Sequence, residues 1–322
     1  MLAARLLRIS RLTQIAVRLA RPFHLSAAVT LTATQVLAQA PTPYDRINAS
    51  AAASPITVHP ARANISMLEG SGGNIGVLSG PDGILMVDAG IAVSRQKIVD
   101  ALRGISPAPL RYAVLTHWHW DHSDGDAWVR GSGASIIASR NAVERLTETI
   151  RVEEWAHTFT PIAPEALPDI VIDEGTTLAL NDETVIVRPY HAGHTDGDLS
   201  VYFVNADVLL TGDTWWNGSF PFIDYVGGGS IDGAIAAADE NLTLVTDHTV
   251  IIPGHGPIGD RSDLVAFRAM LADVRERVAA LKGQGKSLEQ VIAAQPTAGF
   301  DSKWGTGIID GALFTALVFR GV

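Results

Sequence analysis

The sequence Thr116-His117-Trp118-His119-Trp120-Asp121-His122 directly follows an apolar run, residues 112–115, that predicts a buried strand. Side chains alternate in an extended chain, so the first two histidines should share one side, and a turn would bring the Asp121–His122 pair to a neighbouring point. Imidazoles and carboxylates are the ligands that a divalent transition metal takes where no thiolate is offered. Because the chain has no cysteine, any metal site in it must consist of such ligands.

Three further polar residues follow strand-like runs: His194 between Gly and Thr, Asp213 between Gly and Thr, and His255 between two glycines. Taken singly, such residues are usually hydrogen-bonded loop residues or caps. Chance clustering is a weak explanation when all three accompany a run of four potential ligands. A carboxylate has two oxygens, so Asp213 could bridge two cations, as two-metal hydrolases require.

The motifs His-x-His-x-Asp-His, Gly-His-Thr, Gly-Asp-Thr and Pro-Gly-His-Gly, in this order, resemble the metallo-β-lactamase superfamily over roughly residues 60–260. The resemblance implies an α/β fold, a four-layer αββα sandwich of two mixed sheets with helices on the outer faces. It implies three ligands for each of two metals, the first set being His117, His119 and His194 and the second Asp121, His122 and His255. Asp213 would bridge the metals, and Asp88 would support the ligand loop from behind.

A two-metal site of this kind predicts that the protein is a hydrolase. Two cations that share one water lower its pKa toward neutrality, and the bridging hydroxide can then attack an electrophilic carbon. We expect a dinuclear zinc hydrolase, with two Zn²⁺ per chain and iron or manganese as other possible metals, acting on a small ester, lactone, thioester or amide. Asp121 is expected to move the catalytic proton as well as to bind metal.

Two alternatives stay open. The β-lactamases of this superfamily generally carry Cys or Ser where this chain has Asp213, so the aspartate resembles the glyoxalase II and lactonase branches; β-lactam hydrolysis is the first alternative. The second is a mononuclear iron enzyme similar to the persulfide dioxygenases, which an organellar leader would favour.

Aromatic and polar residues beside the ligand motifs are candidates for substrate contacts. The five candidates are Trp118, Trp120, Trp215, Asn217 and Tyr225. The other interpretation of the tryptophans is that they pack between the sheets behind the site.

Residues 1–40 predict a signal or targeting segment. They contain five arginines and no acidic residue, and Ala38-Gln39-Ala40 is a small-x-small cleavage site. Export to the periplasm or secretion is expected, with mitochondrial targeting as the alternative.

The remaining residues, 41–322, predict one hydrolase domain that ends in helices, because no break in composition is long enough for a linker. Strand-like runs include 208–210 and 250–252, and Ser287 with Gln290 forms a capping box. This body carries 19 basic and 34 acidic residues, a formal charge of about −15. Such a charge argues against nucleic acid and anionic membranes as partners, so a small-molecule substrate is expected, with no stable membrane association once the leader is removed. The oligomeric state is left open.

Overall fold

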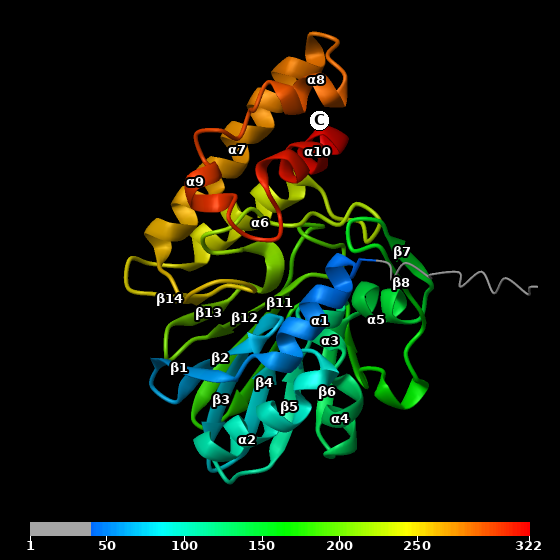
Figure 1. The fold of residues 1–322 in the computed structure, drawn as a ribbon. Coiled ribbons are helices and arrows are strands. Elements are labelled where there is room, and N and C mark those ends of the chain that lie inside the picture. The colour runs from blue at the N-terminus through cyan, green and yellow to red at the C-terminus, as the bar shows by residue number, and fades with distance from the viewer. Residues whose placement is uncertain (1–39) are drawn as a thin grey trace, which may run out of the picture. The chain divides into compact units, whose positions relative to one another are not determined.

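Two β-sheets lie face to face in the computed structural model, which describes residues 40–322 (Figure 1). The first sheet has the order β1-β2-β3-β4-β5-β6-β9. Its strands are β1 (Thr57–Arg62), β2 (Ile65–Ser71), β3 (Gly73–Gly80), β4 (Gly83–Val87), β5 (Leu110–Val114), β6 (Ser135–Ser139) and β9 (Ile170–Ile172). Strands β1 to β4 pair antiparallel, and β4, β5, β6 and β9 pair parallel. The predicted leader, apart from Ala40, lies outside the described residues.

The second sheet has the order β10-β11-β12-β13-β14. Its strands are β10 (Thr176–Leu180), β11 (Glu183–Pro189), β12 (Leu199–Phe203), β13 (Val208–Leu210) and β14 (Val250–Ile252). The first four pair antiparallel, whereas β13 and β14 pair parallel. A separate small hairpin consists of β7 (Ile150–Val152) and β8 (His157–Phe159).

Strand β4, inside the first sheet, is buried on both faces, and its sequence shows how this is achieved. Successive side chains of a strand point to opposite faces. Leu85 and Val87 belong to the core between the two sheets, together with Val201 and Leu210 of the second sheet. Ile84 and Met86 face the other way, into the cluster that contains the helices. An uninterrupted apolar run is therefore what a strand in the middle of a sandwich needs.

Helices form the two outer layers of the sandwich (Figure 1). The helices are α1 (Pro43–Ala53), α2 (Arg95–Ile105), α3 (Trp120–Ser123), α4 (Asp126–Gly131), α5 (Arg140–Leu146), α6 (Ile231–Leu244), α7 (Arg261–Gly283), α8 (Leu288–Ala293), α9 (Asp301–Trp304) and α10 (Gly311–Gly321). Short 3-10 turns lie at Ala92–Ser94, Pro164–Ala166 and Gly212–Thr214. In Figure 1, α7, α8 and α10 gather at one end. The predicted four-layer sandwich is thus confirmed.

Two helices have clear sequence signals at their starts. Helix α1 has Pro43 at its first position and a capping box between Thr42 and Asp45. Helix α8 begins with the predicted capping box of Ser287 and Gln290. None of the helices in residues 40–322 combines the length and the apolar character needed to cross a membrane.

Candidate metal centre

The parallel strand pairs bring the candidate ligands to one edge of the sandwich. In the pair β13–β14, Leu210 lies opposite Ile252. Asp213 and His255 each follow these partners by three residues, so the register itself places them side by side. In the first sheet, Asp88 comes directly after the parallel strand β4, and Thr116 lies two residues after the end of its partner β5. Parallel strands end at a common edge, which is where ligands gather in such sheets.

The remaining ligands are carried by short, buried segments. His117 and His119 follow β5, and α3 carries Asp121 and His122. His194 lies in the loop between β11 and β12, where its backbone N–H donates to Asp198 Oδ2 at 2.7 Å.

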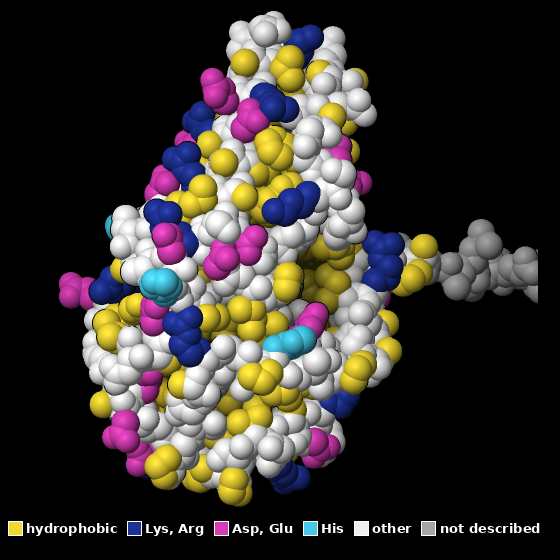
Figure 2. Space-filling model, turned by 90° about the vertical axis from the view of Figure 1, so that its left-hand side faces the viewer, with side chains coloured by type: hydrophobic (Ala, Val, Ile, Leu, Met, Phe, Trp, Pro, Cys, Tyr) yellow, Lys and Arg dark blue, Asp and Glu magenta, His cyan; other side chains and the backbone are white. Residues whose placement is uncertain are grey.

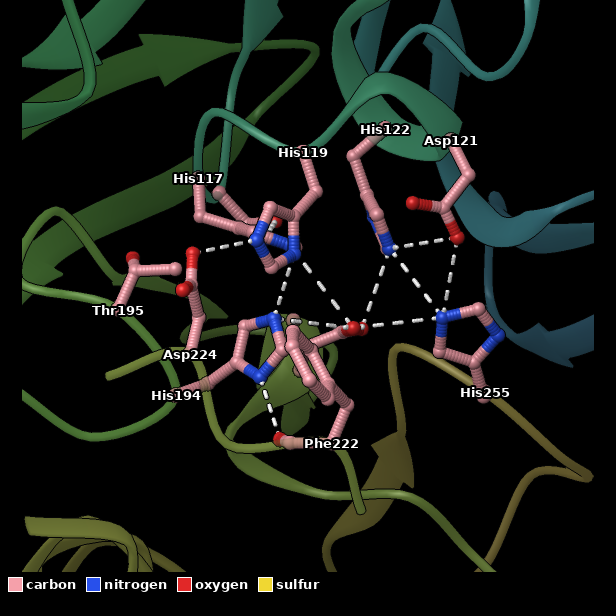
Figure 3. Close-up of polar contacts among 12 residues, drawn as sticks. His117, His119, Asp121, His122, His194, Thr195, Phe222, Asp224 and His255 are labelled. Carbon is pink, nitrogen blue, oxygen red and sulfur yellow. Dashed lines mark hydrogen bonds and ion pairs between the residues drawn. The ribbon is translucent and has the colours of Figure 1, made fainter. Parts of the chain in front are cut away.

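All seven predicted ligands come together as two groups. One group consists of His117, His119, His194 and Asp213, and the other consists of Asp121, His122 and His255. Within each group the potential ligand atoms lie within 4.8 Å of one another. Figure 3 shows the two sets on opposite sides of the centre. We call His117, His119 and His194 the deep half-site, and Asp121, His122 and His255 the outer half-site.

The Asp213 carboxylate contacts both half-sites. Its Oδ2 lies 3.4 Å from His194 Nε2 and 3.8 Å from His117 Nε2 in the deep half-site. The same oxygen lies 3.3 Å from His255 Nε2, and Oδ1 lies 3.1 Å from His122 Nε2, in the outer half-site. This is the position that a bridging carboxylate requires.

Acceptors behind the deep half-site fix the tautomers of two imidazoles. His194 Nδ1 lies 2.7 Å from the Phe222 carbonyl oxygen, which can only accept, so this nitrogen donates. His119 Nε2 donates in the same way to Asp224 Oδ2 at 2.9 Å. In each neutral ring the other nitrogen then carries a lone pair.

These two lone pairs face each other, and that arrangement fits a cation. His194 Nε2 and His119 Nδ1 are 2.8 Å apart. Two lone pairs at this distance repel unless a positive charge lies between them or beside them. His117 Nε2 is also buried without a hydrogen-bond partner among residues 40–322. The donor set therefore fits a divalent metal bound by imidazole nitrogens.

Asp88 fixes the orientation of the histidines on the other flank. It accepts from the Thr116 backbone N–H at 2.7 Å and from Thr116 Oγ1 at 2.9 Å, and it contacts His122 Nδ1 at 2.8 Å. Thr116 Oγ1, whose proton goes to Asp88, accepts from His117 Nδ1 at 3.0 Å. The rings of His117 and His122 therefore direct their Nε2 atoms toward the centre of the cluster. Asp88 thus has the supporting position that the resemblance implied.

The two half-sites differ in the pKa values of their imidazoles. In the deep half-site, burial lowers the pKa of His194 to about 4 and that of His117 well below its ordinary value. In the outer half-site, burial acts in the same direction, but the Asp213 and Asp121 carboxylates outweigh it and raise the pKa of His255 to about 9. The same carboxylates raise the pKa of His122 well above its ordinary value, again against the effect of burial.

A glycine turn between β2 and β3 lets the backbone approach the outer half-site. Gly72 has a φ of +93°, which a side chain would disfavour, and a Cβ there would lie 2.6 Å from Asp121 Cβ. A Cβ on Gly73 would lie 2.2 Å from the ring of His122. Glycine is therefore required because the turn packs directly against metal-cluster residues.

A cavity of about 300 Å³ opens above the cluster and is reached by Asp121, His194, Asp213 and His255. Aromatic residues form one wall, namely Trp120, Trp155, Trp216 and Phe222. Helix α1 and the residue after it form another, with Ile47, Ser50, Ala51 and Ser54.

Of the five predicted substrate contacts, only Trp120 lines this cavity. Trp118 packs instead against Phe159, with ring centroids 5.4 Å apart, and Trp215 is fully buried in the core. Asn217 is used structurally, since its Nδ2 donates to the Pro257 carbonyl oxygen at 2.9 Å. Tyr225 lies against Gly321 of α10. These four side chains therefore lie away from the cavity lining, in contacts with the rest of the fold.

Several residues of the site were not predicted. Asp224 is one of them, and its carboxylate supports His119. Trp155 and α1 come from segments without any metal-binding motif, so the sequence offered no signal for their place at the cavity. Helix α1 itself was not predicted, although Thr42, Pro43 and Asp45 form a start signal.

Comparisons with known proteins identify the family of the chain. The sequence model of the metallo-beta-lactamase superfamily matches residues 68–255, more than half of the chain. A probable metallo-hydrolase of Bacillus subtilis, YqgX, is 29% identical over 165 residues, 49% of this chain and 72% of that protein.

Solved structures share the fold at low identity. A metallo-beta-lactamase from Pontibacter korlensis has a TM-score of 0.56 and 19% identity, and the match covers 68% of this chain and 99% of that one. The sec-alkylsulfatase Pisa1 from Pseudomonas sp. has a TM-score of 0.59 and 16% identity, covering 82% of this chain and 50% of that one. With the family match, these findings lead to one conclusion: the chain belongs to the metallo-beta-lactamase superfamily, as a metallo-hydrolase with a His/Asp metal-binding cluster.

Proposed function

We propose that this protein is a dinuclear zinc hydrolase that cleaves a small ester, lactone, thioester or amide. The observation that supports this most strongly is the Asp213 carboxylate, which contacts histidines of both half-sites. Two cations held there would lower the pKa of a shared water and supply a hydroxide nucleophile near neutral pH.

The chain's own residues orient the reacting groups. In this proposal, Phe222 and Asp224 hold the rings of His194 and His119 through hydrogen bonds, so the ligand atoms need no rearrangement when the substrate arrives. The aromatic wall of the cavity excludes water from the reacting carbonyl.

Asp121 is the proposed proton carrier. It lines the cavity, and its Oδ2 lies 3.3 Å from His255 Nε2. We assign Oδ1, the other oxygen, to take the proton of the attacking water and to return it to the leaving group.

The complete outer half-site favours two metals over the mononuclear iron alternative. A single iron held by three ligands would not need Asp121, His122 and His255 to converge as a second set. The names of two structurally similar proteins, a metallo-beta-lactamase and a sec-alkylsulfatase, suggest two further bonds to test as substrates: the β-lactam amide and the sulfate ester.

The experiment that tests the proposal combines metal content with activity. The purified protein, loaded with zinc and desalted, should contain about two zinc ions per chain and should hydrolyse at least one member of a panel of 4-nitrophenyl esters, lactones and thioesters. A chelator should abolish this hydrolysis, and added zinc should restore it. A zinc-loaded protein without any hydrolytic activity, or a protein that holds one iron and reacts with oxygen, would contradict the proposal.

A further inference from the structure

The wall of the cavity above the metal cluster is largely aromatic. The Trp155 ring centroid lies 4.8 Å from that of Phe222 and 5.7 Å from that of Trp120. These three rings therefore form one continuous surface. Trp216 extends the aromatic lining beside His255, at 4.2 Å between ring centroids. Figure 2 shows a hollow between the C-terminal helices and the sandwich with hydrophobic side chains on its wall. A cavity of this kind accepts an apolar or aromatic group.

Apart from the metal-cluster residues, the charged side chain in the cavity lining is a carboxylate. Glu69 of β2 lines the cavity, with 56% of its side chain exposed. His59 of β1 contacts the Glu69 carboxylate at 2.7 Å, so the pair brings no surplus positive charge. No Lys or Arg is among the cavity-lining residues in the described part of the chain.

The lysine that reaches helix α1 is occupied by backbone carbonyls. Lys97 Nζ donates to Ala51 O at 2.6 Å, to Ala52 O at 3.0 Å and to Ser54 O at 2.5 Å. These bonds hold the end of α1 in place as a cavity wall. They also direct the ammonium group to the helix end, so it is not presented to a substrate.

We propose, resting on the hydrolase function above, that the enzyme selects uncharged substrates with a hydrophobic group and discriminates against substrates that carry an additional anion. The ester or amide carbonyl would occupy the metal end of the cavity. A carboxylate or sulfonate elsewhere on the substrate would then lie against aromatic rings or beside Glu69 without a counterion. Burial of an unpaired charge is strongly unfavourable.

Two matched esters test this selectivity. 4-Nitrophenyl butyrate and 4-nitrophenyl hemisuccinate share a leaving group and a four-carbon acyl chain. They differ at the end of that chain, which is a methyl group in the butyrate and a carboxylate in the hemisuccinate. After subtraction of the rate without enzyme, kcat/KM should favour the butyrate by at least about tenfold. Values within threefold of each other, or a preference for the hemisuccinate, would overturn the proposal.

A substitution at the mouth of the cavity tests the cause. Ile308 lines the cavity and is 41% exposed, so a lysine can replace it with its ammonium in solvent. Ile308→Lys should raise kcat/KM for the hemisuccinate relative to the butyrate by roughly two- to fivefold, the scale of an exposed ion pair. Val265→Lys adds the same charge at an equally exposed site outside the cavity-lining residues and should leave the ratio unchanged. An equal change in both variants would show that overall charge, not the wall, sets selectivity.

A binding measurement separates this inference from the hydrolase function. Butyranilide and its 4-sulfonate derivative can be titrated into the zinc-loaded protein with tryptophan fluorescence as the signal, because three tryptophans line the cavity. A sulfonate is chosen because it competes weakly for metal. Tighter binding of butyranilide supports the selectivity even if neither ester is hydrolysed, in which case only the hydrolase proposal fails. Equal or tighter binding of the sulfonate contradicts the selectivity whatever the activity.

Discussion

The two half-sites of the metal cluster have similar ligands but differ in the exposure and the pKa of their histidines. In the deep half-site the side chains of His117, His119 and His194 are at most 2% exposed, whereas the His255 side chain of the outer half-site is 21% exposed. Burial keeps His194 neutral, with a pKa of about 4, while carboxylates raise the pKa of His255 to about 9. The deep half-site is therefore ready to bind a cation, and the outer half-site must first lose protons.

The largest effect is expected from Asp213, the residue that the half-sites share. Asp213→Ala removes the carboxylate that contacts His194 and His255. Hydrolysis should fall to the level of the metal-free protein, because neither the spacing of the cations nor the shared water would survive. Steady-state kinetics with elemental analysis checks this. Full activity in this variant would rule out a bridging role.

Single histidine substitutions should separate the half-sites. His255→Ala removes an outer ligand and should leave about one zinc per chain. His194→Ala should disturb the deep site and lower the binding of both ions, because in the proposed site the deep imidazoles would hold the first cation. Zinc titration of each variant in the presence of a competing chelator measures the zinc affinities of its two half-sites. The same zinc content in the two variants would show that the half-sites are equivalent.

Acid should empty the outer half-site first. His255 is protonated below pH about 9 in the metal-free protein, so a cation must displace that proton, and its affinity falls as the pH falls. His194 stays neutral until the pH approaches 4, so the deep half-site carries no such penalty at pH 6. From pH 8 to pH 6 the outer affinity should fall by roughly 100-fold for each proton displaced. Loss of both ions at one pH would contradict this order.

Carboxylates behind the ligands give smaller effects that differ between the half-sites. Asp224→Asn weakens the support of His119 and should lower deep-site zinc affinity by about 10- to 100-fold. Asp88→Asn should act on the outer site through His122 and also on His117 through Thr116. Zinc titration of both variants, with thermal unfolding as the control for folding, tests the difference. Identical affinity profiles would mean that these carboxylates only stabilise the fold.

Much of the sandwich could be predicted from the sequence because its strands are short apolar runs bounded by turns. The predicted runs 208–210 and 250–252 are β13 and β14 with the same limits. Their parallel register could not be predicted, since it depends on how the two strands meet in the sheet. The early helix α1 was missed although Thr42, Pro43 and Asp45 form a clear start signal.

The metal cluster could be predicted from the sequence, whereas the cavity lining could not. Ligand residues stand at strand ends in recognisable motifs, so their convergence followed from the resemblance. The cavity depends on which tryptophan faces it, and Trp215 and Trp216 show the limit: the first is fully buried and the second lines the cavity. Loop conformation decides this, and no spacing rule covers it. Asp224 was missed because a lone aspartate in a loop carries no signal of its own.

The most direct test of the central claim, that Asp213 joins two cations, is a crystal structure of the zinc-loaded protein with anomalous scattering recorded at the zinc edge. Two anomalous peaks are expected, one among His117, His119 and His194 and one among Asp121, His122 and His255, with the Asp213 carboxylate in contact with both. A single peak at full zinc loading, or two peaks with Asp213 bound to only one of them, would contradict the claim.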